Sequence, residues 1–272
     1  MTISWDPDFA ARAPMFEPLQ AAAAALRTPY WPGCDDLNRV AAARGMVNAG
    51  GRPLRFVEPP PRRTAFEDKF EPRIFLRGEV QLRACNWHDL LNALVWFTFP
   101  AAKAALNRRH YVELERQRPG GAQNRGPAQD ALTLFDEGGV IVVTADPALG
   151  GLLASHAWKD LFWRRREDVM SRMRFYLFGH ALYEKALAPF AGVTGRGVIF
   201  ETAADFLAQP PASQLPALDE RLARRLNDPA QFTATRELAA VPLLGIPGWC
   251  ADNGSEEYYD DTGYFRPSAR RR

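Results

Sequence analysis

The stretch Asn86-Trp87-His88-Asp89-Leu90-Leu91-Asn92-Ala93-Leu94-Val95-Trp96, continued by Phe97-Thr98-Phe99-Pro100 and residues 101–110, decides the fold. Asn86 is a favourable N-cap, because its side-chain oxygen can accept hydrogen bonds from the unpaired N–H groups of a first helical turn. Apolar side chains then recur at helical spacing as far as Thr98. Pro100 pushes Phe99 out of the helical region and can itself open a new helix. The alanine- and leucine-rich residues 101–111 predict that second helix.

Polar side chains interrupt the apolar pattern on one face of each helix. His88 and Asn92 are four residues apart and share a face of the first helix. The second helix carries polar groups on one face by the same rule: Lys103, Asn107 and His110. If the helices fold back on each other, these faces converge on a site with a base or ligand (His88), an acid (Asp89) and orienting amides. The alternative is that Asp89 only meets the helix dipole, and that the amides only satisfy backbone groups.

Composition places bounds on the class of protein. The chain has 272 residues, 47% of them hydrophobic, and no linker separates two halves, so we expect a single domain. A net charge of +2 argues against a nucleic-acid-binding polyelectrolyte. The three cysteines form no CxxC pair, which favours a reducing compartment over a zinc ribbon. The absence of a signal-like start and of a long apolar run predicts a cytoplasmic protein without a membrane span.

The rest of the chain predicts an α+β fold, mostly helical, with one or two small antiparallel β-hairpins beside the central helix pair. We expect residues 1–13 to form an N-terminal arm, and residues 241–272 to form an extended C-terminal arm with a disordered basic tip, Arg270 to Arg272. Short strands are expected at Leu54 to Val57 and around Gly78, over residues 73–80.

The clearest β pattern is at residues 131–144. Ala131 to Phe135 and Val140 to Thr144 flank Asp136-Glu137-Gly138-Gly139, which predicts a hairpin with glycines in its turn. Asp136 and Glu137 would lie at the tip, where both carboxylates can face one metal ion or one basic partner. The alternative is a solvated polar turn.

A second unusual segment runs from Glu167 to Phe190 and predicts one long helix. His180 and Glu184 fall on its apolar stripe, where burial is costly unless the two groups are paired. At four residues apart they can bond to each other, and Gly179 leaves room for another backbone or a ligand. A perturbed pair in a pocket is a site candidate, whereas a satisfied structural pair is the alternative.

A basic and aromatic stretch precedes that segment. Trp158 to Arg166 holds Lys159, Arg164, Arg165 and Arg166 together with the aromatic residues Trp158, Phe162 and Trp163. This pattern suits contacts with nucleic-acid phosphates. It equally suits the basic face of a surface helix whose aromatic side chains point inward.

Several motifs together support a family resemblance. They are Asn86-Trp87-His88-Asp89-x-x-Asn92-Ala93-Leu94-x-Trp96, Phe99-Pro100-x-x-Lys103-x-x-Leu106-Asn107, residues 130–137, residues 178–184, Leu244-Gly245-Ile246-Pro247-Gly248-Trp249, Tyr259-Asp260-Asp261-Thr262 and Phe265-Arg266-Pro267. With them the chain resembles a bacterial family catalogued as domain of unknown function 3025, over nearly its whole length. The resemblance implies a bacterial cytoplasmic protein and no particular activity. Cys250 stands where that pattern has a second aromatic residue.

Two main hypotheses for the function follow. The first is a metal-dependent hydrolase, phosphodiesterase- or nuclease-like, because carboxylates with imidazole suit a divalent ion that activates water. Its catalytic candidates are His88, Asp89, Asn92, Lys103 and Asn107, and its metal-ligand candidates are His88, Asp136, Glu137, His180 and Glu184. Lys103 or the arginines would steady a phosphate-containing substrate.

The second hypothesis is a non-catalytic module that binds a protein or nucleic acid through the arginine-aromatic surface. The polar groups would then form an internal network that fixes the core. A third hypothesis makes Cys85, near His88 in the chain, a nucleophile, although nothing in the sequence holds thiol and imidazole together.

Overall fold

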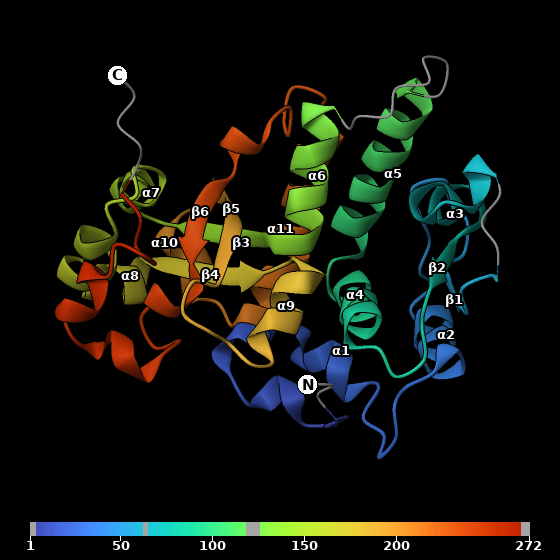
Figure 1. Ribbon diagram of the computed structural model, residues 1–272, viewed down its shortest axis with the longest axis horizontal. Coiled ribbons are helices and arrows are strands. Elements are labelled where there is room, and N and C mark those ends of the chain that lie inside the picture. Colours follow the sequence, from blue (N-terminus) through green and yellow to red (C-terminus); the bar gives the residue numbers. More distant parts are fainter. Residues whose placement is uncertain (1–3, 62–64, 118–125, 268–272) are drawn as a thin grey trace.

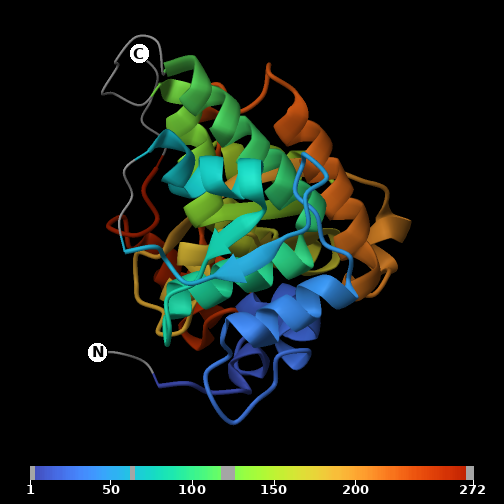
Figure 2. The same cartoon turned by 90° about the vertical axis from the view of Figure 1, so that its right-hand side faces the viewer.

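The computed structural model describes residues 4–61, 65–117 and 126–267. Helices account for 56% and strands for 12%, which confirms an α+β fold that is mostly helical. In Figure 1, α2, α3, β1 and β2 lie at one end, and the larger sheet with α7 and α8 lies at the other. Helices α4, α5, α6 and α9 lie between these two ends, as the view in Figure 2 also shows for α4 and α5.

The bounds of the α-helices are α1 (Gln20–Ala24), α2 (Cys34–Ala43), α3 (Phe70–Arg77), α4 (Trp87–Thr98), α5 (Pro100–Gln117), α6 (Pro127–Gly138), α7 (Pro147–Ala154), α8 (Arg166–Arg172), α9 (His180–Ala186), α10 (Ala204–Ala208) and α11 (Pro211–Asn227). The strands are β1 (Arg55–Val57), β2 (Glu79–Gln81), β3 (Gly139–Thr144), β4 (Met173–Leu177), β5 (Thr194–Glu201) and β6 (Ala239–Pro242).

The larger sheet has the order β4-β3-β5-β6, in which β3 and β5 are the inner strands. All six residues of β3 are buried, as expected for a run of valine and isoleucine covered on both faces. Strand β3 pairs antiparallel with β4 and parallel with β5, and β5 pairs antiparallel with β6. The core of this half is therefore built from strands far apart in the sequence.

The hairpin predicted over residues 131–144 is wrong in its first half. Pro127–Gly138 is helix α6, with Pro127 at its first position and Ala131, Leu132 and Phe135 on its buried face. Gly139 then opens β3 directly. Asp136 and Glu137 consequently lie in the last turn of a helix and not at the tip of a hairpin, and only Asp136 of the two is buried.

The long helix predicted from Glu167 to Phe190 is also wrong. Helix α8 ends at Arg172, residues 173–177 form β4, and a separate helix, α9, begins at His180. The aromatic and apolar run Met173–Leu177 pairs with β3 along its whole length, so sheet formation overrides the local helical pattern. His180 and Glu184 therefore belong to a short helix that begins at the sheet edge.

The corner between α4 and α5 is as predicted. The side chain of Asn86 accepts a hydrogen bond from the backbone N–H of Asp89 at 3.0 Å, and α4 ends before Pro100. Asp219 of α11 caps the start of α5, because its carboxylate accepts hydrogen bonds from the backbone N–H groups of Ala101 and Ala102 at 3.0 and 2.7 Å. Figure 1 shows α4 nearly end-on and α5 lengthwise, so the helices cross instead of folding back on each other.

Arg109 joins the C-terminal end of α11 to the middle of α5. Its guanidinium is buried and donates to the carbonyl oxygens of Leu226, Asp228 and Gln231 at 2.8, 2.8 and 3.2 Å. These bonds satisfy carbonyl groups at and beyond the C-terminal end of α11. The start of α5 is thus tied to the middle of α11, and the middle of α5 to the C-terminal end of α11.

The smaller sheet pairs β1 with β2 in parallel and lies beside α3. The strand predicted over residues 73–80 is wrong for its first part, since Phe70–Arg77 is helical and only Glu79–Gln81 is extended. Gly78 ends α3 with φ of +73°, and a Cβ there would lie 2.2 Å from the carbonyl oxygen of Pro53. A glycine is therefore required at this join.

The terminal segments are mostly short 3-10 turns. Phe9, within the predicted N-terminal arm, is buried in a turn over Phe9–Ala11. In the C-terminal segment, Tyr259, Tyr264 and Phe265 are buried, and the hydroxyl of Tyr264 donates to the carbonyl oxygen of Val193 at 2.9 Å. Arg270 to Arg272 lie outside the described residues. A search of the described residues finds no helix with the length and apolar character to cross a membrane.

Candidate functional site

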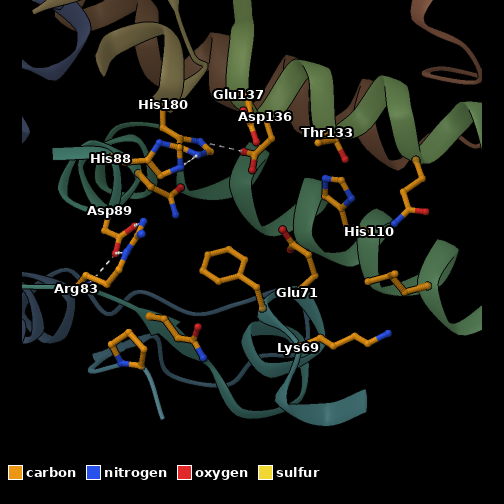
Figure 3. Close-up of a pocket in the computed structure, with 16 residues that line it drawn as sticks. Lys69, Glu71, Arg83, His88, Asp89, His110, Thr133, Asp136, Glu137 and His180 are labelled. Carbon is orange, nitrogen blue, oxygen red and sulfur yellow. Dashed lines mark hydrogen bonds and ion pairs between the residues drawn. The ribbon is translucent and has the colours of Figure 1, made fainter. Parts of the chain in front are cut away.

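A cavity of about 520 Å³ lies between α3 and the group α4, α5, α6 and α9 (Figure 3). Six of the side chains singled out in the sequence line it: His88, Asp89, Asn92, Asp136, Glu137 and His180. Lys103 and Asn107 lie behind it, around a much smaller hollow that shares Glu71, His110 and Asp136 with the main cavity. The structure thus brings most of the candidate residues to one place.

A chain of hydrogen bonds runs from the surface into this cavity. Glu184, which is 45% exposed, accepts from Nδ1 of His88 at 2.9 Å. Nε2 of His88 lies 3.0 Å from Nε2 of His180, and the rings are nearly perpendicular. His180 is buried, so the chain leads from solvent to the interior. His180 and Glu184 are therefore linked through His88. This differs from the sequence-based prediction, in which the two residues bond directly to each other.

The positions of the protons in this chain follow from the chemistry of imidazole. The carboxylate of Glu184 requires a proton on Nδ1 of His88. In a neutral His88, Nε2 is then an acceptor, and Nε2 of His180 must donate to it. A neutral His180 is left with a lone pair on Nδ1, and that atom has no hydrogen-bond partner in the structure. The inner end of the chain is thus Nδ1 of His180, with its lone pair unshared.

Asp136 faces that nitrogen. Its Oδ1 lies 3.9 Å from Nδ1 of His180 and accepts from the ammonium group of Lys103 at 2.5 Å. Burial, the largest single effect, acts to raise the pKa of Asp136, but Lys103, His180 and His110 together outweigh it and lower the pKa to about 2. Burial also lowers the pKa of His180 to about 4, although the Asp136 carboxylate opposes this shift. At neutral pH, an ionised carboxylate and a neutral imidazole therefore lie side by side.

Gly179 makes this arrangement possible. A Cβ at Gly179 would lie 2.4 Å from the carbonyl oxygen of Glu137, which is closer than any side chain allows. The prediction that another backbone approaches this glycine is therefore confirmed. The start of α9 packs directly on the end of α6, which places His180 beside Asp136.

Glu71, His110 and Asp136 form a second group on the same cavity wall. One side-chain ligand atom from each lies within 4.8 Å of the others. Burial raises the pKa of Glu71, and the neighbouring Asp136 adds to this effect, while His110 opposes it. Two carboxylates and one imidazole are a donor set that suits a divalent cation.

The two asparagines differ in their surroundings. Asn107 donates from Nδ2 to the carbonyl oxygen and to Oε2 of Glu71, at 3.0 and 2.6 Å, so it fixes that residue. Asn92 is 4% exposed, lines the cavity, and its Oδ1 has no hydrogen-bond partner in the structure. Oδ1 of Asn107 also has no partner, but it faces the small hollow, so of the two only Asn92 offers its amide to a molecule in the main cavity.

Other predicted residues have different surroundings. Asp89 accepts from the guanidinium of Arg83 at 2.8 and 2.7 Å and from its backbone N–H at 2.7 Å, so both carboxylate oxygens are used. Glu137 is exposed at the cavity edge. Lys103 is bound to Asp136 and lies behind the main cavity, so the geometry makes it a partner of that carboxylate and does not place it against a substrate phosphate.

The model of one protein family matches residues 54–270, which is most of the chain. That family is described as a protein of unknown function (DUF3025). The chain belongs to this family. The matched span contains every cavity residue named above. A search of curated proteins and a search of solved structures gave no match.

In this DUF3025 protein the arginines predicted to bind nucleic acid are engaged within the chain. Arg164 pairs with Asp160, and Arg165 pairs with Asp168 and Asp146. Arg166 donates to the carbonyl and side-chain oxygens of Asn253. Figure 1 places α8 and its neighbouring turn far from α4 and α6, so this surface and the cavity are separate features of the family member.

The structure does not pair the thiol of Cys85 with His88. Cys85 is exposed, and His88 already uses both ring nitrogens for Glu184 and His180, so no imidazole nitrogen is left for the thiol. Glu71 was not anticipated, because it lies just before a segment predicted as a strand. His110 was placed on the polar face of its helix but was given no role; its spacing from Lys103 and Asn107 was the available signal.

Proposed function

We propose that this protein is a metal-dependent hydrolase whose reaction takes place in the cavity, with His180 as the general base. The observation that carries the proposal is the unpartnered Nδ1 of His180, which lies 3.9 Å from an ionised carboxylate in a solvent-connected cavity. A lone pair and a carboxylate at this distance leave room for a proton donor or a cation between them. A water molecule there would donate to His180.

The hydrogen-bonded chain supports the proton transfer that hydrolysis needs. As the water oxygen forms its bond to the electrophilic phosphorus, His180 takes a water proton on Nδ1, and its Nε2 proton shifts toward His88. The carboxylate of Glu184 stabilises the positive charge that His88 gains. The bond to the leaving group breaks, the leaving oxygen takes the Nδ1 proton of His180, and the proton on His88 returns to Nε2 of His180, which restores the chain. A positioned base of this kind contributes roughly 10²- to 10⁴-fold in rate.

A bound divalent ion would polarise the substrate and lower the pKa of the attacking water. The carboxylates and imidazoles of the cavity suit such an ion. The effect of the ion on the water matters because burial makes His180 a weak base, with a pKa of about 4. A more acidic water is needed for efficient transfer to such a base.

The cavity favours a small phosphate-containing substrate over a nucleic acid. Its volume of about 520 Å³ is in the range typical of small-molecule sites. Lys69 brings positive charge to the lining, whereas the charge of Arg83 is balanced by Asp89, and Asn92 offers an amide for orientation. The arginines 164–166, by contrast, are used in ion pairs and hydrogen bonds far from the cavity.

The test is hydrolysis by the purified protein after removal and re-addition of metal. Chromogenic phosphomonoester, phosphodiester and carboxylic ester substrates would be assayed with Mn²⁺, Mg²⁺ and Zn²⁺, for wild type, His180→Ala and His156→Ala. His156 is a matched control, because it is a partly buried histidine stacked on Trp158 and not part of the cavity lining. We expect metal-dependent phosphoester hydrolysis that His180→Ala abolishes and His156→Ala retains. No turnover with any substrate and ion would overturn the proposal.

A further inference from the structure

The position of a metal ion can be argued from the group Glu71, His110 and Asp136. Their ligand atoms lie within 4.8 Å of one another. Ligands bound about 2.1 Å from one divalent ion lie about 3–4 Å apart, so small side-chain adjustments bring all three into contact with one ion. The residues come from α3, α5 and α6, and Figure 3 shows the three side chains directed toward a common space.

His110 is the second observation that points to a ligand at this place. Its side chain is only 4% exposed, yet its ring makes no hydrogen bond to any residue that the structure describes. It lines both the main cavity and the small hollow behind it. Because the ring lines the cavity and makes no hydrogen bond within the described chain, its nitrogens are available to a ligand from outside the chain. A cation between His110 and the carboxylates would be such a ligand.

The surroundings hold the two carboxylates in place for such an ion. Asn107 donates to Oε2 of Glu71 at 2.6 Å, and Lys103 donates to Oδ1 of Asp136 at 2.5 Å. Each carboxylate is therefore anchored through one oxygen, and its other oxygen remains for a ligand. Second partners of this kind orient metal ligands and raise metal affinity.

We propose that Glu71, His110 and Asp136 bind a single divalent ion of the hard, oxygen-preferring class, with Mn²⁺ or Mg²⁺ as its representatives. Two carboxylates, one imidazole and no thiolate favour this class over a structural zinc site. Three protein ligands leave coordination positions open toward the cavity for water and substrate. The inference deepens the proposed function, because His180 contacts the same Asp136 region and can take a proton from a water on the ion.

The experiment measures Mn²⁺ binding directly, by calorimetry and by the electron paramagnetic resonance signal of free Mn²⁺, on EDTA-treated full-length protein. The variants are Glu71→Gln and His110→Ala, with Glu137→Gln as control. Glu137 is an exposed carboxylate at the edge of the same cavity and was itself a ligand candidate. Circular dichroism and thermal melting establish that each variant is folded. Glu71→Gln preserves shape and hydrogen bonding, and keeps the test decisive if His110→Ala does not fold.

We expect wild type and Glu137→Gln to bind one Mn²⁺ with equal affinity, and Glu71→Gln and His110→Ala to lose at least about tenfold. Binding by Glu71→Gln at wild-type affinity, or loss in Glu137→Gln alone, would overturn the assignment. Metal-dependent hydrolysis that survives in Glu71→Gln would remove this ligand set and leave the proposed function standing. Mn²⁺ binding through these residues without hydrolysis of any substrate would support the metal site and remove the hydrolase.

Discussion

Nε2 of His88 and Nε2 of His180 lie 3.0 Å apart, although 92 residues separate them in the chain. The contact joins the first turn of α4 to the first turn of α9, and Glu184 completes it from the solvent side. The imidazole of His88 is thus partly exposed, and that of His180 is buried. This difference in exposure allows the two residues to be separated by experiment.

His88→Ala is expected to lower the turnover number by about 100-fold, because His180 loses the group that shares its proton. The melting temperature should fall by only about 4–8 °C, since His88 is 32% exposed and two hydrogen bonds of about 1 kcal/mol each are lost. Steady-state kinetics and calorimetry measure the two effects. A collapse in stability would instead favour the view that the polar cluster is an internal network of a binding module.

Lys103→Met is expected to destabilise the fold by about 3–5 kcal/mol, because it leaves the Asp136 carboxylate buried and uncompensated. Urea denaturation measures the loss. The double variant with Asp136→Asn should recover part of the stability, since the orphaned charge is then absent. If the single variant is as stable as wild type, the ion pair does not exist in solution as described.

Gly179→Ala is expected to cost about 1–3 kcal/mol, because the new Cβ meets the carbonyl oxygen of Glu137 and forces α9 away from α6. Hydrolysis should fall with it, since His180 moves away from Asp136. Gly151→Ala is the control: it lies in α7 with nothing within 4 Å of a new Cβ, and should be neutral or slightly stabilising. Equal stability of the two variants would contradict the close packing.

Asp219 is expected to make stability depend on pH. Burial raises the pKa of Asp219 from 3.8 to about 6, although the N–H groups of Ala101 and Ala102 oppose the shift. The protonated form is therefore favoured in the fold, so this contribution is complete below about pH 4 and is lost as pH rises through about 6. The shift corresponds to about 3 kcal/mol.

Free energies of unfolding from urea titrations at pH 4 to 7 test this dependence in wild type and Asp219→Asn. The asparagine cannot ionise, so its stability relative to wild type should increase between pH 4 and pH 6. A difference that is constant with pH would show that the carboxylate ionises in the fold as easily as in the unfolded chain.

The predictable parts of the fold are those that local signals control. The cap at Asn86 and the break at Pro100 depend on neighbours within four residues, and both are found as predicted. Residues 131–135 and 173–177 were misassigned, because short apolar runs suit either a helix or a strand. Their fate is set by long-range pairing: β3 pairs with β4 and β5, whose residues lie about 30 to 60 positions away.

The candidate site shows the same limit. Polar groups on helical faces identified His88 and His180, and the acidic pair after an apolar run identified Asp136; the fold brings these three together. Their order in the chain of contacts could not be predicted, because it depends on how α9 begins after β4. Glu71 carries no local signal: it is an ordinary acidic residue in the first turn of a short helix, and only the packing of α3 on α5 brings it to the cavity.

Arg109 influences the back wall of the cavity through the position of helix α5. Lys103, Asn107 and His110 project from successive turns of one helix, so they move as a rigid set when that helix slides or rotates. The bonds from Arg109 to the carbonyl groups at the end of α11 fix the position of α5 along α11. Sequence changes on the outer face of α11 can therefore shift α5 and alter the distances between the polar groups of the cavity, although they change no residue that lines it. Related chains can in this way differ in selectivity while they keep the same polar groups.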